Sequence, residues 1–116
     1  MLAALVGGLA CGGGDDGASL ADEPVPDDPD VVIVAQDMAF DPDEVQVAAD
    51  RPVSIVLDNR DEGVNHNLHV KDAPAPNETP LEQGVSRQGL TVTLPAGEYE
   101  FVCDIHPNMD GTLVAR

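Results

Sequence analysis

Aromatic side chains are scarce in this sequence, which has one Tyr, two Phe and no Trp among its 116 residues. A hydrophobic core must therefore be built mainly from Val, Leu, Ile and Ala, and the length allows one domain of modest size. No apolar run approaches the roughly 20 residues that a membrane-spanning helix needs. No stretch repeats its apolar residues with the period of a helix, so the pattern does not favour a helical bundle.

Basic residues are also few. The chain has 5 Lys and Arg against 22 Asp and Glu, and its formal net charge is -17. This balance excludes nucleic acid as a partner, because the neutralisation of phosphates requires Lys and Arg. An acidic surface repels copies of itself, so we expect a monomer whose protein partners present a basic docking face.

The N-terminal segment, residues 1–11, is an apolar run that ends at Cys11. It resembles a bacterial lipoprotein signal, in which such a cysteine becomes the lipidated first residue; an ordinary secretory signal is the alternative. We therefore expect an exported protein, periplasmic or at the outer face of the membrane. Lipid chains on Cys11 would anchor the protein to the membrane. Each methylene buried in the bilayer contributes about 0.8 kcal/mol to the free energy of membrane binding.

Residues 12–30 contain mostly Gly, Pro and acidic residues and show no hydrophobic periodicity. Such a segment cannot bury enough apolar surface to offset the entropy of ordering it. We predict a disordered, flexible tether here, extended by repulsion between its acids. The folded domain is then expected to span residues 31–116.

Short β-branched or alternating runs separated by turn residues fill the rest of the chain. They predict about seven strands, which we place at residues 31–37, 44–48, 52–58, 64–70, 90–94, 98–103 and 111–116. The fold class they indicate is an all-β sandwich. In the long loop of residues 71–88, Thr79-Pro80-Leu81-Glu82 has the form of a capping box with Pro at the first helical position, which allows one helical turn.

Three side chains with metal-binding atoms follow the strand that we expect at residues 98–103. Cys103, His106 and Met109 are spaced three residues apart. A thioether is a poor ligand for zinc, calcium or magnesium and a reasonable one for copper. One Cys and two His in a trigonal set, with a distant Met on the axis, form the ligand set of a blue-copper electron-transfer site.

A second histidine has to come from the expected strand at residues 64–70, which contains His66 and His69. Side chains three apart in a strand point to opposite faces, so a continuous strand brings only one of them to a metal. The face with Leu68 and Val70 points inward and includes His66. His66 is therefore the predicted ligand, and His69 is expected to face solvent or to lie beside the site. A zinc site formed by both histidines with Cys103 and His106 is the alternative that this alternation disfavours.

The segments VNHNLHV and YEFVCDIHPNMDG resemble the cupredoxins, the small blue-copper proteins of the amicyanin and plastocyanin type. The short spacing Cys-x-x-His-Pro-x-Met-x-Gly is similar to the amicyanin form, and it is matched by Cys103, His106, Pro107, Met109 and Gly111. The resemblance covers residues 31–116. Within the motif, this chain has an aspartate at position 104, where the family often has Ser or Thr.

The resemblance implies a Greek-key β-sandwich with one type 1 copper ion. His66, Cys103 and His106 would be the equatorial ligands and Met109 the axial one. Asn67 would hydrogen-bond near the cysteine loop and connect the two halves of the site.

The function implied is that of a one-electron carrier between redox proteins, and not that of an enzyme. The alternative is a copper-binding module for storage, delivery or tolerance. Catalytic copper domains need further histidines for a second copper centre, and the chain has three in all. A disulfide between Cys11 and Cys103 would tie the tail into the candidate site, so we expect each cysteine to have a separate role.

Overall fold

The computed structural model describes residues 24–116 of the chain. The expected export signal, Cys11 and most of the expected tether lie outside these residues. The described part forms ten β-strands: β1 (Val31–Gln36), β2 (Ala39–Asp41), β3 (Glu44–Val47), β4 (Pro52–Asn59), β5 (Asn65–His66), β6 (His69–Val70), β7 (Glu82–Gln83), β8 (Ser86–Thr93), β9 (Gly97–Cys103) and β10 (His106–Ala115). None of the described residues belongs to a helix long and apolar enough to cross a membrane.

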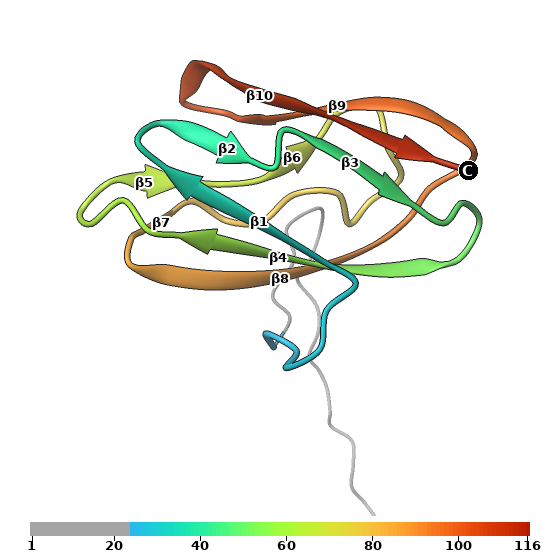
Figure 1. Cartoon of the computed structure of the whole chain (residues 1–116), viewed down its shortest axis with the longest axis horizontal. Coiled ribbons are helices and arrows are strands. Elements are labelled where there is room, and N and C mark those ends of the chain that lie inside the picture. The colour runs from blue at the N-terminus through green and yellow to red at the C-terminus, as the bar shows by residue number, and fades with distance from the viewer. Residues whose placement is uncertain (1–23) are drawn as a thin grey trace, which may run out of the picture.

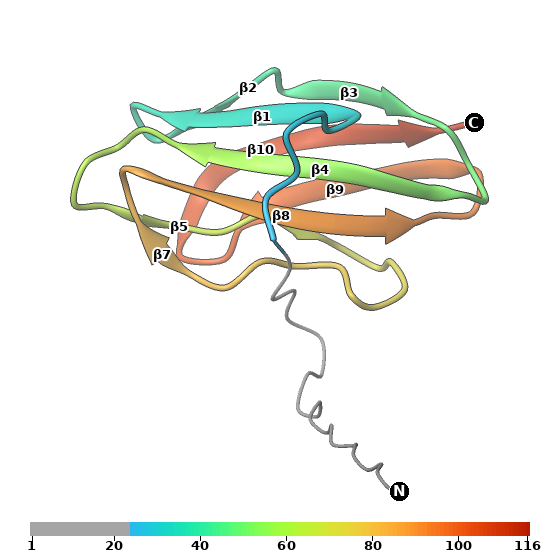
Figure 2. The same cartoon turned by 90° about the horizontal axis from the view of Figure 1, so that it is seen from below.

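Two four-stranded sheets pack face to face (Figures 1 and 2). One sheet has the strand order β2-β1-β4-β8 and the other has the order β3-β10-β9-β6. The β1–β4 and β3–β10 pairs are parallel, whereas the remaining pairs are antiparallel. The predicted all-β sandwich is therefore confirmed, with a separate β5–β7 pair at one end.

The core between the sheets is almost entirely aliphatic, as the scarcity of aromatic residues predicts. In β4, the side chains of Val53, Ile55 and Leu57 are buried in the core, and Val56 between them is buried as well. The two phenylalanines meet edge to face across the core, with the ring centroids of Phe40 and Phe101 5.2 Å apart. This contact joins β2 in one sheet to β9 in the other across the core.

The strand that we predicted at residues 64–70 is broken in two. β5 pairs with β7, whereas β6 pairs with β9 in the large sheet. The break follows from Thr79, whose N–H donates to the Leu68 carbonyl oxygen (2.9 Å) and whose Oγ1 accepts the Leu68 N–H (3.0 Å).

The same contacts show that the helical turn allowed at residues 79–82 is wrong. The hydroxyl of Thr79 is bound to the amide of Leu68 and does not cap a helix. Glu82 lies in β7, opposite His66 in β5. Pairing with a strand distant in the sequence thus overrides a local capping signal.

Strand β10 begins well before the predicted start at residue 111. His106 pairs with Cys103, the register then shifts, and regular pairing resumes where Asp110 meets Val102. The residues between them bulge out of the sheet at its end. A β-bulge of this kind re-aims side chains at a functional site, and here it includes Met109.

The chain enters the sandwich through paired hydrogen bonds between Asp30 and Ser54. The Asp30 N–H donates to the carbonyl oxygen of Ser54 (2.9 Å) and to its Oγ (3.2 Å). The Ser54 N–H donates to Oδ2 of Asp30 (2.9 Å). These bonds attach the segment that precedes β1 to the middle of the sheet.

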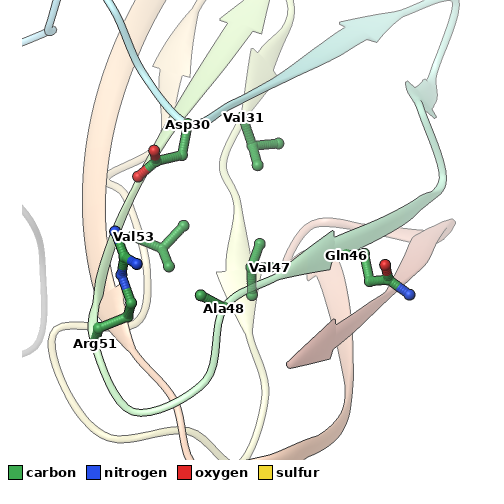
Figure 3. Close-up of a pocket in the computed structure, with 7 residues that line it drawn as sticks. All are labelled: Asp30, Val31, Gln46, Val47, Ala48, Arg51 and Val53. Carbon is green, nitrogen blue, oxygen red and sulfur yellow. The ribbon is translucent and has the colours of Figure 1, made fainter. Parts of the chain in front are cut away.

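A pocket of about 200 Å³ lies next to this attachment, where β3 ends and β4 begins. Its lining residues are Asp30, Val31, Gln46, Val47, Ala48, Arg51 and Val53 (Figure 3). This end of the sandwich is opposite the β1–β2 turn. None of the candidate metal ligands lines the pocket, so it takes no part in the site.

Gly111 is required where β10 crosses Phe101. A Cβ at this position would clash with the Phe101 ring and lie 2.8 Å from the carbonyl oxygen of Asp43. We expect Gly111→Ala to lower the free energy of unfolding by about 1–3 kcal/mol, the usual cost of overpacking. Urea unfolding measures this loss. Asp110→Ala, at an exposed neighbour on the same strand, should stay within about 0.5 kcal/mol of the parent. Equal losses in the two variants would contradict this account.

Candidate metal centre

His66, Cys103 and His106 meet at one end of the sandwich. The Sγ atom of Cys103 lies 3.3 Å from Nδ1 of His106 and 3.8 Å from Nδ1 of His66. The two imidazole rings are edge to face, with centroids 4.9 Å apart. Among the described residues, these three are recognised as a group whose ligand atoms are close enough to share one ion. The histidine selected by strand alternation is thus the one that reaches the cysteine.

The cluster is buried except at His106. The exposed fractions are 0% for His66, 2% for Cys103 and 1% for Met109, whereas His106 is half-buried. Met109 and His106 line the same small pocket, of about 180 Å³, together with Met38, Pro107 and Asn108. Met109, although buried, therefore borders the same pocket as the half-buried His106.

Asp61 fixes the orientation of His66. Its Oδ2 lies 2.8 Å from Nε2 of His66. A proton on Nε2 makes this a hydrogen bond from the imidazole to the carboxylate, and it leaves the Nδ1 lone pair directed at the sulfur. A carboxylate on the far nitrogen of a ligating histidine also makes the imidazole a better donor to a metal.

The same carboxylate also holds the β1–β2 turn. The N–H groups of Asp37 and Met38 donate to Asp61 over 2.7 Å and 3.1 Å. Both turn residues are in the left-handed region, with φ of 56° and 61°. Partial burial raises the pKa of Asp61, but the hydrogen bonds from His66, Met38 and Asp37 outweigh it and hold this pKa below its usual value. The ionised carboxylate therefore connects the turn to the metal cluster.

Asn67 and Asp104 connect the strand of His66 to the cysteine loop. The Asn67 side chain donates to Oδ2 of Asp104 (3.0 Å) and to the carbonyl oxygen of Thr79 (3.3 Å), and its Oδ1 accepts the Asp104 N–H (2.9 Å). His69 Nδ1 lies 2.9 Å from the other oxygen of Asp104. Burial raises the pKa of Asp104, and the hydrogen bonds from His69 and Asn67 lower it further than burial raises it. The carboxylate is therefore bound by Asn67 and His69.

His69 does not join the cluster around Cys103. Its ligand atoms group instead with those of Glu78 and Asp104. The zinc alternative that requires both histidines around the sulfur is therefore not assembled in the structure.

Sequence analysis missed Asp61, which it treated only as part of a turn. The carboxylate lies five positions before His66, and no spacing rule marks it as the partner of that histidine. Its role depends on the hairpin at Asp37 and Met38, more than twenty residues away.

The donor set of the cluster fits copper. A thiol and two imidazole Nδ1 atoms converge, and the buried Met109 lines a pocket together with one of the two histidines, His106. Thiolate and thioether ligands select copper over magnesium or calcium, and imidazole suits it as well. Both Nδ1 atoms already lie within 3.8 Å of the sulfur, so a metal beside it needs no rearrangement of the fold.

A family model described as a cupredoxin-like domain matches residues 16–115 of the sequence. This chain belongs to the cupredoxin-like family. The match covers all three histidines and the whole segment from Cys103 to Met109, so the resemblance noted in the sequence is confirmed. Comparison of this cupredoxin-like sequence with curated proteins gives no match.

Solved structures agree with the family. Auracyanin A, titled a "blue" copper protein from Chloroflexus aurantiacus, is 28% identical, with a TM-score of 0.61 over 73% of this chain and 96% of its own. A mutant amicyanin in the reduced Cu(I) form at pH 4 is 26% identical, with a TM-score of 0.62 over 77% of this chain and 84% of its own. Dithionite-reduced auracyanin from Roseiflexus castenholzii is 20% identical and shares the fold, with a TM-score of 0.64 over 74% of this chain and 95% of its own.

Proposed function

We propose that this cupredoxin-like protein binds one copper ion through His66, Cys103, His106 and Met109. We also propose that it carries single electrons between proteins and catalyses no reaction of its own. One observation carries the proposal: two imidazole Nδ1 atoms face one buried thiol at 3.3 Å and 3.8 Å. The likeness to auracyanin A, a blue copper protein by its title, supports the choice of metal.

The bound copper would supply the change between Cu(II) and Cu(I), and the chain would supply a site that moves little during it. Cys103 has to lose its proton to become a ligand. His66 is held by Asp61, and the cysteine loop is held by the paired bonds between Asn67 and Asp104. Ligands whose orientation is fixed by such hydrogen bonds need little reorganisation when an electron arrives or leaves.

The exposed edge of His106 is the proposed path for electrons. Among the four proposed ligands it is the one that is not fully buried. Its surroundings at the surface include Met38 and Pro107, which gives a partner an apolar contact next to the ligand. Acidic residues over the rest of the molecule would attract a redox protein with a basic docking face.

We further propose that the protein is exported and attached to the outer face of the membrane through lipid on Cys11. The support is the apolar run that precedes this cysteine and the acidic, Gly- and Pro-containing segment that follows it. Mass spectrometry of the protein from a bacterial host would detect the lipid. A protein in which residues 1–10 are still attached to Cys11 and no lipid is present would contradict the anchor.

An absorption spectrum of the copper-loaded protein tests the main proposal. We expect an intense blue colour that ascorbate removes and ferricyanide restores, with one copper per chain by metal analysis. A module for copper storage or delivery would bind the metal without this reversible cycle. Stoichiometric copper with no blue band would overturn electron transfer and leave the storage alternative.

Met109→Gln tests the axial ligand. We expect the variant to keep one copper per chain but to change in colour and to have a lower midpoint potential, because an amide oxygen is harder than a thioether and favours Cu(II). Voltammetry and the visible spectrum measure both effects. The matched control is Met38→Gln, which removes a thioether from the same pocket at an exposed position. Met109 is not a ligand if its substitution changes the spectrum and potential no more than the control does.

A further inference from the structure

A second group of metal-binding side chains lies on the other side of the cysteine loop. It consists of His69 in β6, Glu78 in the following loop and Asp104 directly after Cys103, and their ligand atoms all lie within 4.8 Å of one another. The side chains of His69 and Asp104 are 27% and 39% exposed, so the group can be reached from solvent. It shares no residue with the cluster of His66, Cys103 and His106.

Hydrogen bonds fix the positions of the three residues in the fold. Glu78 lies opposite His69 in an antiparallel bridge. Backbone hydrogen bonds flank this bridge on both sides, from Val70 to Asn77 (2.8 Å) and from Thr79 to Leu68 (2.9 Å). Asp104 is held by its two-way contact with the buried Asn67, described above. The group is therefore a built arrangement from three chain segments, and it differs in this from acids that happen to be close on a surface.

We propose that His69, Glu78 and Asp104 form a second cation site, for a divalent ion of the zinc class. One imidazole and two carboxylates are a known kind of zinc ligand set, with water completing the tetrahedron. Zinc binds such nitrogen and oxygen atoms at about 2.0–2.2 Å, so donors already within 4.8 Å of one another need only small side-chain rotations. The contact of His69 Nδ1 with Asp104 Oδ1, now 2.9 Å, would open to admit the ion.

The charge of the surroundings favours occupation by a cation. Two carboxylates approach one imidazole here, in a protein whose formal net charge is -17. A divalent ion would be attracted by both carboxylates. Because Asp104 directly follows Cys103, the ion would also place positive charge near the cysteine sulfur. If the sulfur holds copper, as proposed above, this charge favours Cu(I), and the midpoint potential rises when the second site is filled.

Calorimetric titration of the copper-loaded protein with Zn²⁺ tests the site. We expect the parent to bind one zinc more than His69→Ala at equal copper content. Glu78→Gln keeps the size of the side chain and should weaken this zinc binding by about tenfold or more, because it replaces a charged ligand. Asp110→Asn, which removes an exposed acid from β10, is the matched control and should bind as the parent does.

Thermal unfolding without zinc shows whether each variant is folded, and Glu78→Gln provides the test if His69→Ala is not. Equal zinc stoichiometry and affinity in the parent, His69→Ala and Glu78→Gln would overturn the proposal. An equal loss in Asp110→Asn would also overturn it, since zinc would then respond only to the total charge.

The midpoint potential gives a second readout, and this one rests on the proposed function. Zinc should raise the potential of the parent and leave that of His69→Ala unchanged. A zinc count that depends on His69, in a protein without a blue redox centre, would support the cation site and reject the electron carrier. A protein with a reversible blue centre, whose zinc stoichiometry does not depend on His69, would support the electron carrier and reject the cation site.

Discussion

Cys103→Ser is expected to abolish the stabilisation of the fold by copper. The thiol is the buried centre of the cluster and the one soft anionic ligand there, whereas a serine hydroxyl is hard and keeps its proton. With free copper at a thousandfold excess over Kd, binding stabilises the folded state by about 4 kcal/mol. For a domain of this size, that corresponds to a rise in Tm on the order of 20 °C. Melting curves recorded by circular dichroism with and without copper measure it.

The matched control for this prediction is Cys11→Ser, which removes the other sulfhydryl of the chain. It should keep both the copper-dependent rise in Tm and the blue absorption, while Cys103→Ser loses both. An equal rise in Tm for the two variants would show that copper stabilises the protein from somewhere other than the proposed site. The comparison also tests the expectation that the two cysteines have separate roles.

Asp61→Asn is expected to damage both the fold and the site. The carboxylate is bound to Nε2 of His66 and accepts the N–H groups of Asp37 and Met38. An amide has one oxygen for these donors, and its NH₂ group faces at least one of them. We expect a loss of about 2–3 kcal/mol in the free energy of unfolding of the metal-free protein, since hydrogen bonds to charged groups contribute about 1.5–3 kcal/mol. Copper affinity should fall by about ten- to a hundredfold, the usual effect of losing a hydrogen-bond partner of a metal-binding histidine.

Asp58→Asn is the control, because Asp58 pairs with Arg60 near the surface, at 3.0 Å. A pair of this kind is worth less than about 1 kcal/mol, and it has no contact with His66. Urea unfolding and a copper competition titration, applied to both variants, separate the two effects. If Asp61→Asn and Asp58→Asn behave alike, Asp61 does not position the histidine.

The residues of the cluster could be predicted from the sequence because two local rules apply to them. Cys103, His106 and Met109 are close in the chain, and their spacing alone suggests a common ion. His66 was separated from His69 by the alternation of a strand. The strand is in fact broken between them, at Asn67 and Leu68, but His66 still groups with Cys103 while His69 groups with Asp104.

The parts that could not be predicted depend on partners far away in the sequence. Thr79 and Glu82 carry the signal of a helix start, and only the position of Leu68 and His66 turns them into the partners of a strand. β2, β5, β6 and β7 have two or three residues each, too few for alternation to show. Asp61 and Glu78 are ordinary surface acids in the sequence, and they acquire a role only when the hairpin and the loop fold against them.

The hydrogen-bonded attachment of Asp30 to Ser54 has a mechanical consequence. If the N-terminus is fixed to a membrane, any pull on the domain passes through the segment before β1. This segment lies against Gly89 of β8 at Pro24 and Pro26, and three hydrogen bonds of Asp30 and Ser54 attach it to β4. The ligand cluster lies at the far end of the strands, beside the β1–β2 turn. A force at the anchor would load these contacts before it reached the ligand cluster, so movement of the membrane would disturb the geometry around the sulfur little.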